Sequence, residues 1–110
     1  MVKRISLVWR RPELTRQAFR SIWLDEHATH AQRLTGLREY VIDFVHDAPE
    51  GAPDAIATVR FDSREALDTA FALPDLKTDL IRSRDQFAAA VQLLFVDEYT
   101  VVGGESRRWK

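Results

Sequence analysis

The stretch LLFVDEYTVV, residues 93–102, opens with four consecutive apolar residues and decides the fold of this chain. A strand with one solvated face alternates apolar and polar side chains, whereas an unbroken apolar run needs cover on both faces. The rest of the chain supplies enough predicted helix to cover one face of a small sheet. The other face would stay wet and apolar in a monomer, which is typical of an interface. Residues 93–102 therefore predict a dimer whose sheets meet face to face.

Upstream of this strand, the hydrophobic pattern predicts the order β-α-β-β-α-β. Thr15 is expected to cap a first helix that stops at Gly36, and Asp62 or Ser63 to cap a second. Period-two and helical spacing place strands at 3–10, 37–46, 55–61 and 93–102, and further helix at 75–91. This order predicts an α+β, ferredoxin-like βαββαβ fold with a four-stranded antiparallel sheet, which pairs into a dimeric α/β barrel.

Composition limits the classes of function. The chain of 110 residues, 45% of them apolar, is expected to form one domain over 1–110, with a charged tail at 103–110. A net charge of −1 predicts neither nucleic acid nor a membrane surface as a partner. No apolar run approaches the ~20 residues that span a bilayer, and residues 1–14 lack a signal-peptide core, so we expect a cytoplasmic protein. The absence of cysteine excludes disulfides, zinc–thiolate sites and thiol nucleophiles.

The first predicted helix carries WLDEHATHA, residues 23–31, which concentrates titratable side chains. At about 100° per residue, Trp23 and His30 lie near the centre of the apolar stripe, and His27 lies about 40° to one side. Zinc-binding helices of the zincin type place two histidines four residues apart, with a glutamate after the first. Here His27 and His30 are three apart and Ala28 follows His27, so no metal site is expected.

Five side chains are candidates for a functional site. His27, at the edge of the helix stripe, is placed to act as a general acid or base in a gap between helix and sheet. A histidine that is hydrogen-bonded in the core is the alternative interpretation for both His27 and His30. Tyr40 either donates to an oxyanion or packs the sheet. Trp9 and Trp23 either wall an apolar cavity or belong to the core.

The stretch FRSIWLDEHATHAQRLTGLREYVI, residues 19–42, resembles the EthD family of dimeric α+β-barrel proteins. Further pieces of the family pattern are RRPELTRQAF before it, and VRFDSREAL and FVDEYTVV after it, so that the resemblance covers nearly the whole chain. Its most specific part is the pair Trp23 and His27 with Gly36-Leu37 downstream. Thr29 departs from the pattern, because the family often has proline there.

The resemblance implies a homodimer of ferredoxin-like protomers, each with a pocket between its helices and its own sheet. Enzymes that it resembles need no cofactor, and members without known activity also occur. We therefore expect an acid–base isomerase, cyclase or decarboxylase that acts on a small apolar cyclic or aromatic metabolite, without cofactor or metal. His27 and Tyr40 would be catalytic, and Trp9, Trp23 and His30 would bind substrate. The alternatives are a non-catalytic ligand-binding or structural dimer, and a haem protein.

Overall fold

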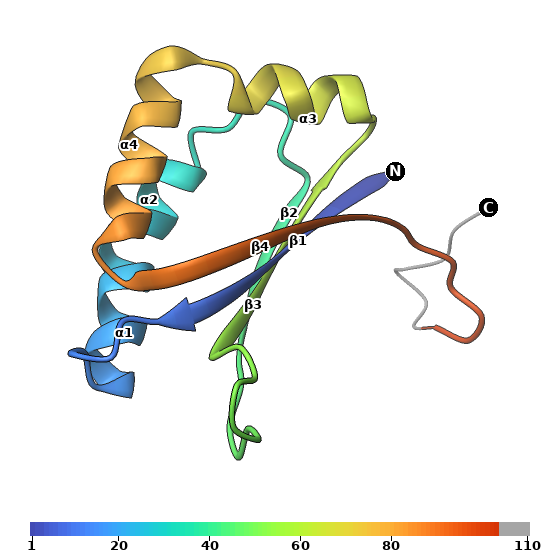
Figure 1. Cartoon of the computed structure of the whole chain (residues 1–110). Coiled ribbons are helices and arrows are strands. Elements are labelled where there is room, and N and C mark those ends of the chain that lie inside the picture. Colours follow the sequence, from blue (N-terminus) through green and yellow to red (C-terminus); the bar gives the residue numbers. More distant parts are fainter. Residues whose placement is uncertain (104–110) are drawn as a thin grey trace.

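The computed structural model describes residues 1–103 and consists of one antiparallel sheet with helices packed on one face (Figure 1). The strands lie in the order β2-β3-β1-β4. They are β1 (Val2–Arg10), β2 (Glu39–Phe44), β3 (Ala55–Phe61) and β4 (Ala88–Asp97). The helices are α1 (Arg16–Ile22), the π-helix η1 (Trp23–His27), α2 (Ala28–Ala31), α3 (Arg64–Phe71) and α4 (Pro74–Asp85). Apart from Gly103, the predicted tail lies outside the described residues.

The side chains of the central strand β1 point alternately to the two faces of the sheet. It pairs antiparallel with β3 on one side and with β4 on the other. Successive side chains of a strand point to opposite faces. Arg4, Ser6 and Val8 face the helices and line the cavity described below. Ile5 and Leu7 consequently face the side of the sheet that carries no helix.

The first helical segment runs without a break through α1, η1 and α2. It begins at the N-cap Thr15, whose side chain accepts a hydrogen bond from the Ala18 N–H at 3.0 Å. In η1 the Ala28 N–H bonds the Trp23 carbonyl, five residues back, so the helix widens by one residue there. After α2 the chain turns at Gly36, whose φ of 85° is strained for any residue with a side chain.

The expected boundary between the last helix and the last strand was wrong. Helix α4 ends at Asp85 instead of continuing to residue 91, and β4 covers 88–97 instead of 93–102. Ala88 and Ala90 favour helix by propensity, but they pair with β1 across the sheet, with a register irregularity at its end. Tertiary pairing overrides local propensity in such a segment. The result is that Phe87 lies in the connection, where its ring is buried.

An aromatic cluster joins the first helical segment to the sheet. Trp23, which is 2% exposed, stacks on Phe87 with ring centroids 4.8 Å apart. Phe19 meets the edge of Trp23 at 5.6 Å, and Phe44 of β2 meets the same indole at 5.8 Å. Aromatic pairs in these geometries add to the stability from burial alone. The cluster fixes η1 over the middle of the sheet and so sets the position of the candidate site.

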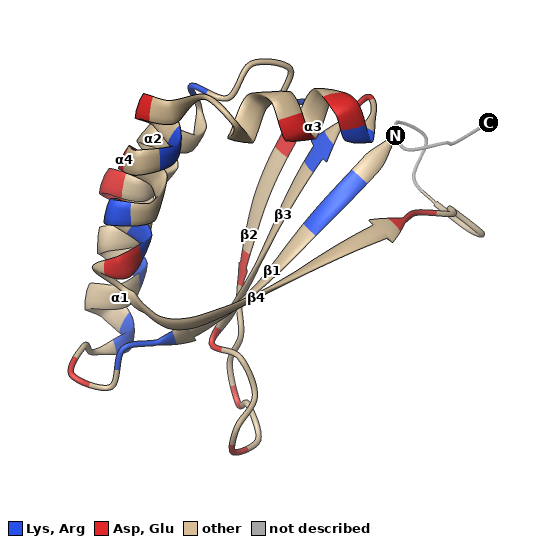
Figure 2. Ribbon diagram, turned by 45° about the horizontal axis from the view of Figure 1, so that its top comes forward, with Lys and Arg blue, Asp and Glu red and all other residues tan. Residues whose placement is uncertain are grey.

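The face of the sheet away from the helices has an apolar patch, and beside it Lys3, Arg60 and Glu39 take part in ion pairs. Figure 2 shows charged residues frequent on the helices and sparse along the strands. Cross-strand pairing brings Leu94 beside Ile5 and Ile56 beside Leu7 on this face. Leu94 is 40% exposed, whereas Leu93 points back toward the helices. The apolar run at the start of LLFVDEYTVV thus divides between the two faces, as the sequence predicted.

No described helix is long and apolar enough to cross a membrane.

Candidate active site

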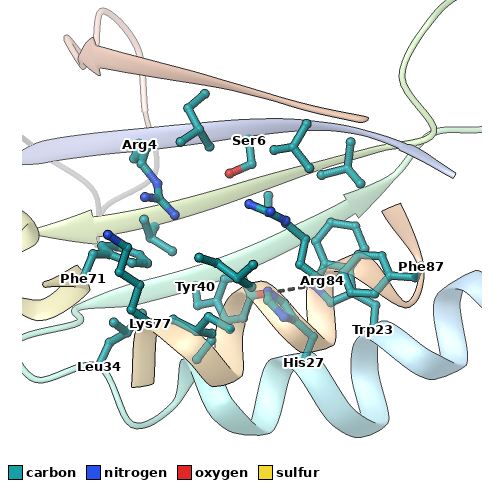
Figure 3. A pocket seen from close by; sticks show the side chains of 18 residues that line it. Arg4, Ser6, Trp23, His27, Leu34, Tyr40, Phe71, Lys77, Arg84 and Phe87 are labelled. Atoms are coloured by element: carbon teal, nitrogen blue, oxygen red, sulfur yellow. Dashed lines mark hydrogen bonds between the residues drawn. The ribbon is translucent and has the colours of Figure 1, made fainter. Parts of the chain in front are cut away.

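A cavity of about 230 Å³ lies between the helices and the sheet (Figure 3). Its walls come from β1, η1, β2, β3, α3, α4 and β4, so that distant parts of the sequence meet there. Most of the wall is apolar, and the rings of Trp23, Phe71 and Phe87 contribute to it. The polar lining residues are Arg4, Ser6, His27, Tyr40, Lys77 and Arg84. The arrangement suits a small, largely apolar molecule with a few polar groups.

His27 lies at the cavity wall, and α4 determines its orientation. Its Nδ1 is 2.6 Å from the Oγ of Ser83, a buried residue of α4. The donor in this hydrogen bond depends on the tautomer of His27. The Ser83 hydroxyl also lies 3.2 Å from the Leu80 carbonyl, to which it can donate its single proton. When it does so, Oγ accepts from the Nδ1–H of His27, and the Nε2 lone pair is the basic position of the ring.

The surroundings of His27 favour its neutral form. Burial, together with the positive charges of His30, Arg84 and Arg4, lowers the pKa of His27 to about 4. The rings of Trp23 and Phe87 approach the imidazole with centroids 6.4 and 5.3 Å away. At neutral pH, His27 is consequently an uncharged proton acceptor in a mostly apolar setting.

Tyr40 reaches the same cavity from β2. The Trp23 indole Nε1–H donates to the Tyr40 hydroxyl oxygen at 2.8 Å. With its oxygen accepting from Trp23, the phenol keeps its own proton available for donation. Burial raises the pKa of Tyr40, although the bond from Trp23 and the charge of Arg4 act in the opposite direction. Tyr40 is thus a neutral hydrogen-bond donor beside His27.

Three basic residues of the cavity were missed by the sequence analysis. Arg4 points in from β1, Arg84 and Lys77 approach from α4, and Lys77 lies at the exposed rim. Arg4 carried one usable signal, because a charged residue at a helix-facing position of a strand requires a partner or a ligand. Arg84 and Ser83 carried none, because their position beside His27 depends on how α4 packs against η1.

Two of the sequence candidates do not line this cavity. Trp9 lies on the opposite face of the sheet from Arg4, Ser6 and Val8, and its Nε1–H donates to the Gly51 carbonyl at 3.0 Å. Trp9 therefore does not line the cavity that Trp23 lines, because strand alternation separates them, and a role for Trp9 in substrate binding stays a prediction.

His30 lies outside the cavity as well. Its Nδ1 is 3.1 Å from an exposed Arg33 nitrogen, on the outer side of α2. The change of pitch at η1 removes His30 from the line that an uninterrupted α-helix predicts for it. His30 therefore does not line this cavity, and a role for it in substrate binding stays a prediction. Within residues 1–103, no three His, Cys, Asp or Glu side chains gather as metal ligands.

The fold and the cavity define a ferredoxin-like protomer with a candidate site between its helices and its sheet. A family model for the EthD domain matches residues 11–91. The chain belongs to the EthD family, as the sequence resemblance predicted. No curated protein matches the chain.

Solved structures agree on the fold. An EthD family protein from Bacillus halodurans C-125 shares 24% identity with a TM-score of 0.72, over 90% of this chain and 99% of its own. A dimeric ferredoxin-like protein of unknown function from Thermobifida fusca YX shares 13%, with a TM-score of 0.68 over 86% and 88%. SnoaB, a cofactor-independent oxygenase from Streptomyces nogalater, shares 14%, with a TM-score of 0.65 over 88% and 91%. These likenesses confirm the ferredoxin-like fold.

Proposed function

We propose that this chain is a cofactor-independent acid–base enzyme that acts on a small, largely apolar cyclic or aromatic molecule. The observation that carries the proposal is the pairing of a neutral, oriented His27 with the donor Tyr40 in one cavity. An acid–base reaction needs a proton acceptor and a stabiliser of the developing negative charge. His27 and Tyr40 supply these two roles without a metal or cofactor.

In the proposed reaction, the Nε2 of His27 removes a proton from a carbon next to a carbonyl. The electrons of the broken C–H bond move into the carbonyl group, which becomes an enolate. The Tyr40 hydroxyl donates a hydrogen bond to the enolate oxygen, and Trp23 holds Tyr40 in place. Return of the proton from His27 to a different atom gives an isomer, so that the cycle balances without an oxidant. In a ring closure, the same enolate carbon attacks a second carbonyl of the substrate, whose oxygen takes the proton from His27. In a decarboxylation, the C–C bond to the carboxylate of a β-keto acid breaks instead of a C–H bond, CO₂ leaves, and the resulting enolate carbon is protonated.

Proton exchange tests the proposal before the natural substrate is known. We expect wild-type protein to catalyse exchange of α-protons for deuterium in a panel of small cyclic ketones and lactones in D₂O, followed by proton NMR. A general base contributes about 10²–10⁴-fold, so H27Q should slow the exchange by about that factor. H46Q is the matched control, because the side chain of His46 is 91% exposed and lies outside the cavity. Equal exchange by wild type and H27Q would overturn the role of His27.

The rival function is a non-catalytic ligand-binding protein. The observation that favours it is the pKa of His27, which at about 4 makes the free imidazole a weak base. Tight binding of panel compounds without exchange would support this rival. Haem binding through His27 is disfavoured by size, because 230 Å³ lies below the roughly 300–1,000 Å³ of pockets for drug-sized ligands.

The sheet face away from the helices supports a homodimer. Its apolar residues Ile5, Leu7, Val41, Ile56 and Leu94 are not fully buried in the protomer, and charged residues such as Lys3, Arg60 and Glu39 share the face. An exposed apolar patch of this kind marks an interaction site. The Thermobifida fusca relative of the same fold is dimeric. We infer that two copies of this chain pair through this face, which leaves both cavities on the outside of the paired sheets.

A further inference from the structure

The charged residues that line the cavity are all basic. Arg4, Lys77 and Arg84 line it, and none of its lining residues is an aspartate or glutamate. The chain as a whole has 17 acidic against 16 basic residues, so this imbalance is local. Buried or half-buried charges in proteins are normally paired with an opposite charge. Within the part of the chain that the structure describes, the cavity supplies cations and no anion to balance them.

Arg4 is the clearest case. Its Nε is buried and has no hydrogen-bond partner among the described residues. The contact that its guanidinium makes is with a ring, because its central carbon lies 3.8 Å from the centroid of Phe71. Burial, and next the charge of Arg84, lower the pKa of Arg4 to about 10, so that it stays charged at neutral pH. The guanidinium thus points into the cavity with a buried Nε–H that has no acceptor among the described residues.

Arg84 completes the positive end of the cavity. Its own partner is Asp85, an exposed neighbour 3.2 Å away, and such surface pairs contribute little. The charge of Arg84 acts on both Arg4 and His27, so the three groups lie within electrostatic reach of one another. Figure 3 shows Arg4 and Arg84 directed toward the same space from β1 and from α4. An anion placed there would meet two guanidinium groups at once.

We propose that the ligand of this cavity is an anion, a small apolar molecule with a carboxylate group that Arg4 and Arg84 bind. Guanidinium groups match the planar carboxylate and give short, charge-assisted hydrogen bonds. The inference rests on the proposed function, since it names the substrate class of the same site. It also has a consequence for the chemistry. Burial is the main cause of the low pKa of His27, and the charges of Arg84 and Arg4 add to it. A carboxylate beside Arg4 and Arg84 offsets these two charges, and the ligand thereby makes His27 a stronger base.

Matched pairs of carboxylates and amides test the proposal with the full chain. Benzoate and benzamide have the same shape and differ in charge, and cyclohexanecarboxylate and its amide form a second pair. We expect calorimetry to show that each carboxylate binds at least about tenfold more tightly than its amide. R4Q and R84Q should each remove most of this preference. R82Q is the control, because Arg82 is an exposed residue of the same helix that does not line the cavity.

Two further measurements separate the possible failures. R4K keeps the charge and should retain part of the preference even if R4Q fails to fold. In an NMR titration, benzoate should raise the pKa of His27 toward neutrality and benzamide should leave it unchanged. Equal binding of acid and amide, or no binding of any carboxylate at millimolar concentration, would overturn the anionic ligand. Carboxylate preference without proton exchange would overturn the enzyme and leave the anionic ligand standing.

Discussion

At the scale of single residues, Ser83 determines what His27 can do. A serine hydroxyl has one proton, which Ser83 can donate to the Leu80 carbonyl inside α4 or to the Nδ1 of His27. Donation to Leu80 selects the Nδ1–H form of His27, which the proposed reaction requires, and donation to Nδ1 selects the Nε2–H form. Ser83 does not line the cavity, so it acts on the chemistry through His27 alone. It is a positioning residue.

Replacing Ser83 by alanine should therefore change the tautomer of His27. In wild type, ¹⁵N NMR is expected to show the Nδ1–H form, and S83A should show a mixture of both forms. The lost partner leaves a half-buried ring nitrogen unsatisfied, which should reduce the free energy of unfolding by about 1–3 kcal/mol. S21A, an exposed serine in α1, is the control for both readouts. An unchanged ¹⁵N pattern in S83A would contradict the positioning role.

The low pKa of His27 makes a prediction about stability. The folded pKa is about 4 and the ordinary value is 6.5, so between these values the unfolded chain binds more protons than the folded one. Stability should consequently fall as pH decreases, by about 2 kcal/mol between pH 7 and 5. Urea unfolding of wild type and H27Q at both pH values isolates this contribution, because groups such as Arg4, Arg84 and His30 are common to both. An equal loss in both proteins would show that His27 titrates normally.

At the scale of elements, the helical segment 16–31 carries the site because of its local irregularity. The π-turn at η1 places Trp23 and His27, four residues apart, at the wall of the same cavity. Wider turns of this kind often occur at functional sites. The segment begins at Thr15, and its cap is separate from the cavity. Its stability and its chemistry can therefore be tested with different substitutions.

Removing the cap should weaken the protein without affecting ligand binding. T15A loses the hydrogen bond to the Ala18 N–H and is expected to reduce the free energy of unfolding by about 1 kcal/mol. T78A is the control, because Thr78 is an exposed residue inside α4 and its loss should change stability by less than about 0.5 kcal/mol. Urea titration measures both. A loss in T78A as large as that in T15A would argue against the cap.

The elements also show which features of the fold and of the candidate site could be predicted from sequence patterns. The predicted strand 55–61 agrees with β3, because its apolar residues alternate and Ser63 caps the helix that follows. Trp23, His27 and Tyr40 were predicted from helix periodicity and the family resemblance. Arg84 and Ser83 were not, because their contact with His27 depends on how α4 packs against η1, which no local pattern records. The error at residues 86–91 has the same origin, since pairing with β1 determined that segment.

At the scale of the whole molecule, the sheet face predicts its oligomeric state. Light scattering is expected to give wild type twice the protomer mass of 12.7 kDa. L94E places a charge on the proposed interface, beside Ile5, and should shift the protein to the monomer or to aggregates. L24E is the control, because Leu24 is similarly exposed but belongs to η1. A wild-type monomer at micromolar concentration would contradict the paired sheets.

Because side chains alternate along β1, the residues for ligand binding and those for the proposed interface can change independently. Arg4, Ser6 and Val8 belong to the cavity, while Ile5 and Leu7 belong to the proposed interface. A substitution at position 4, 6 or 8 is thus expected to change what the protein binds, and one at position 5 or 7 to change the proposed pairing of two copies. New ligands can then be acquired without loss of the proposed interface. An insertion of one residue in β1 would exchange the two sets and destroy both properties together.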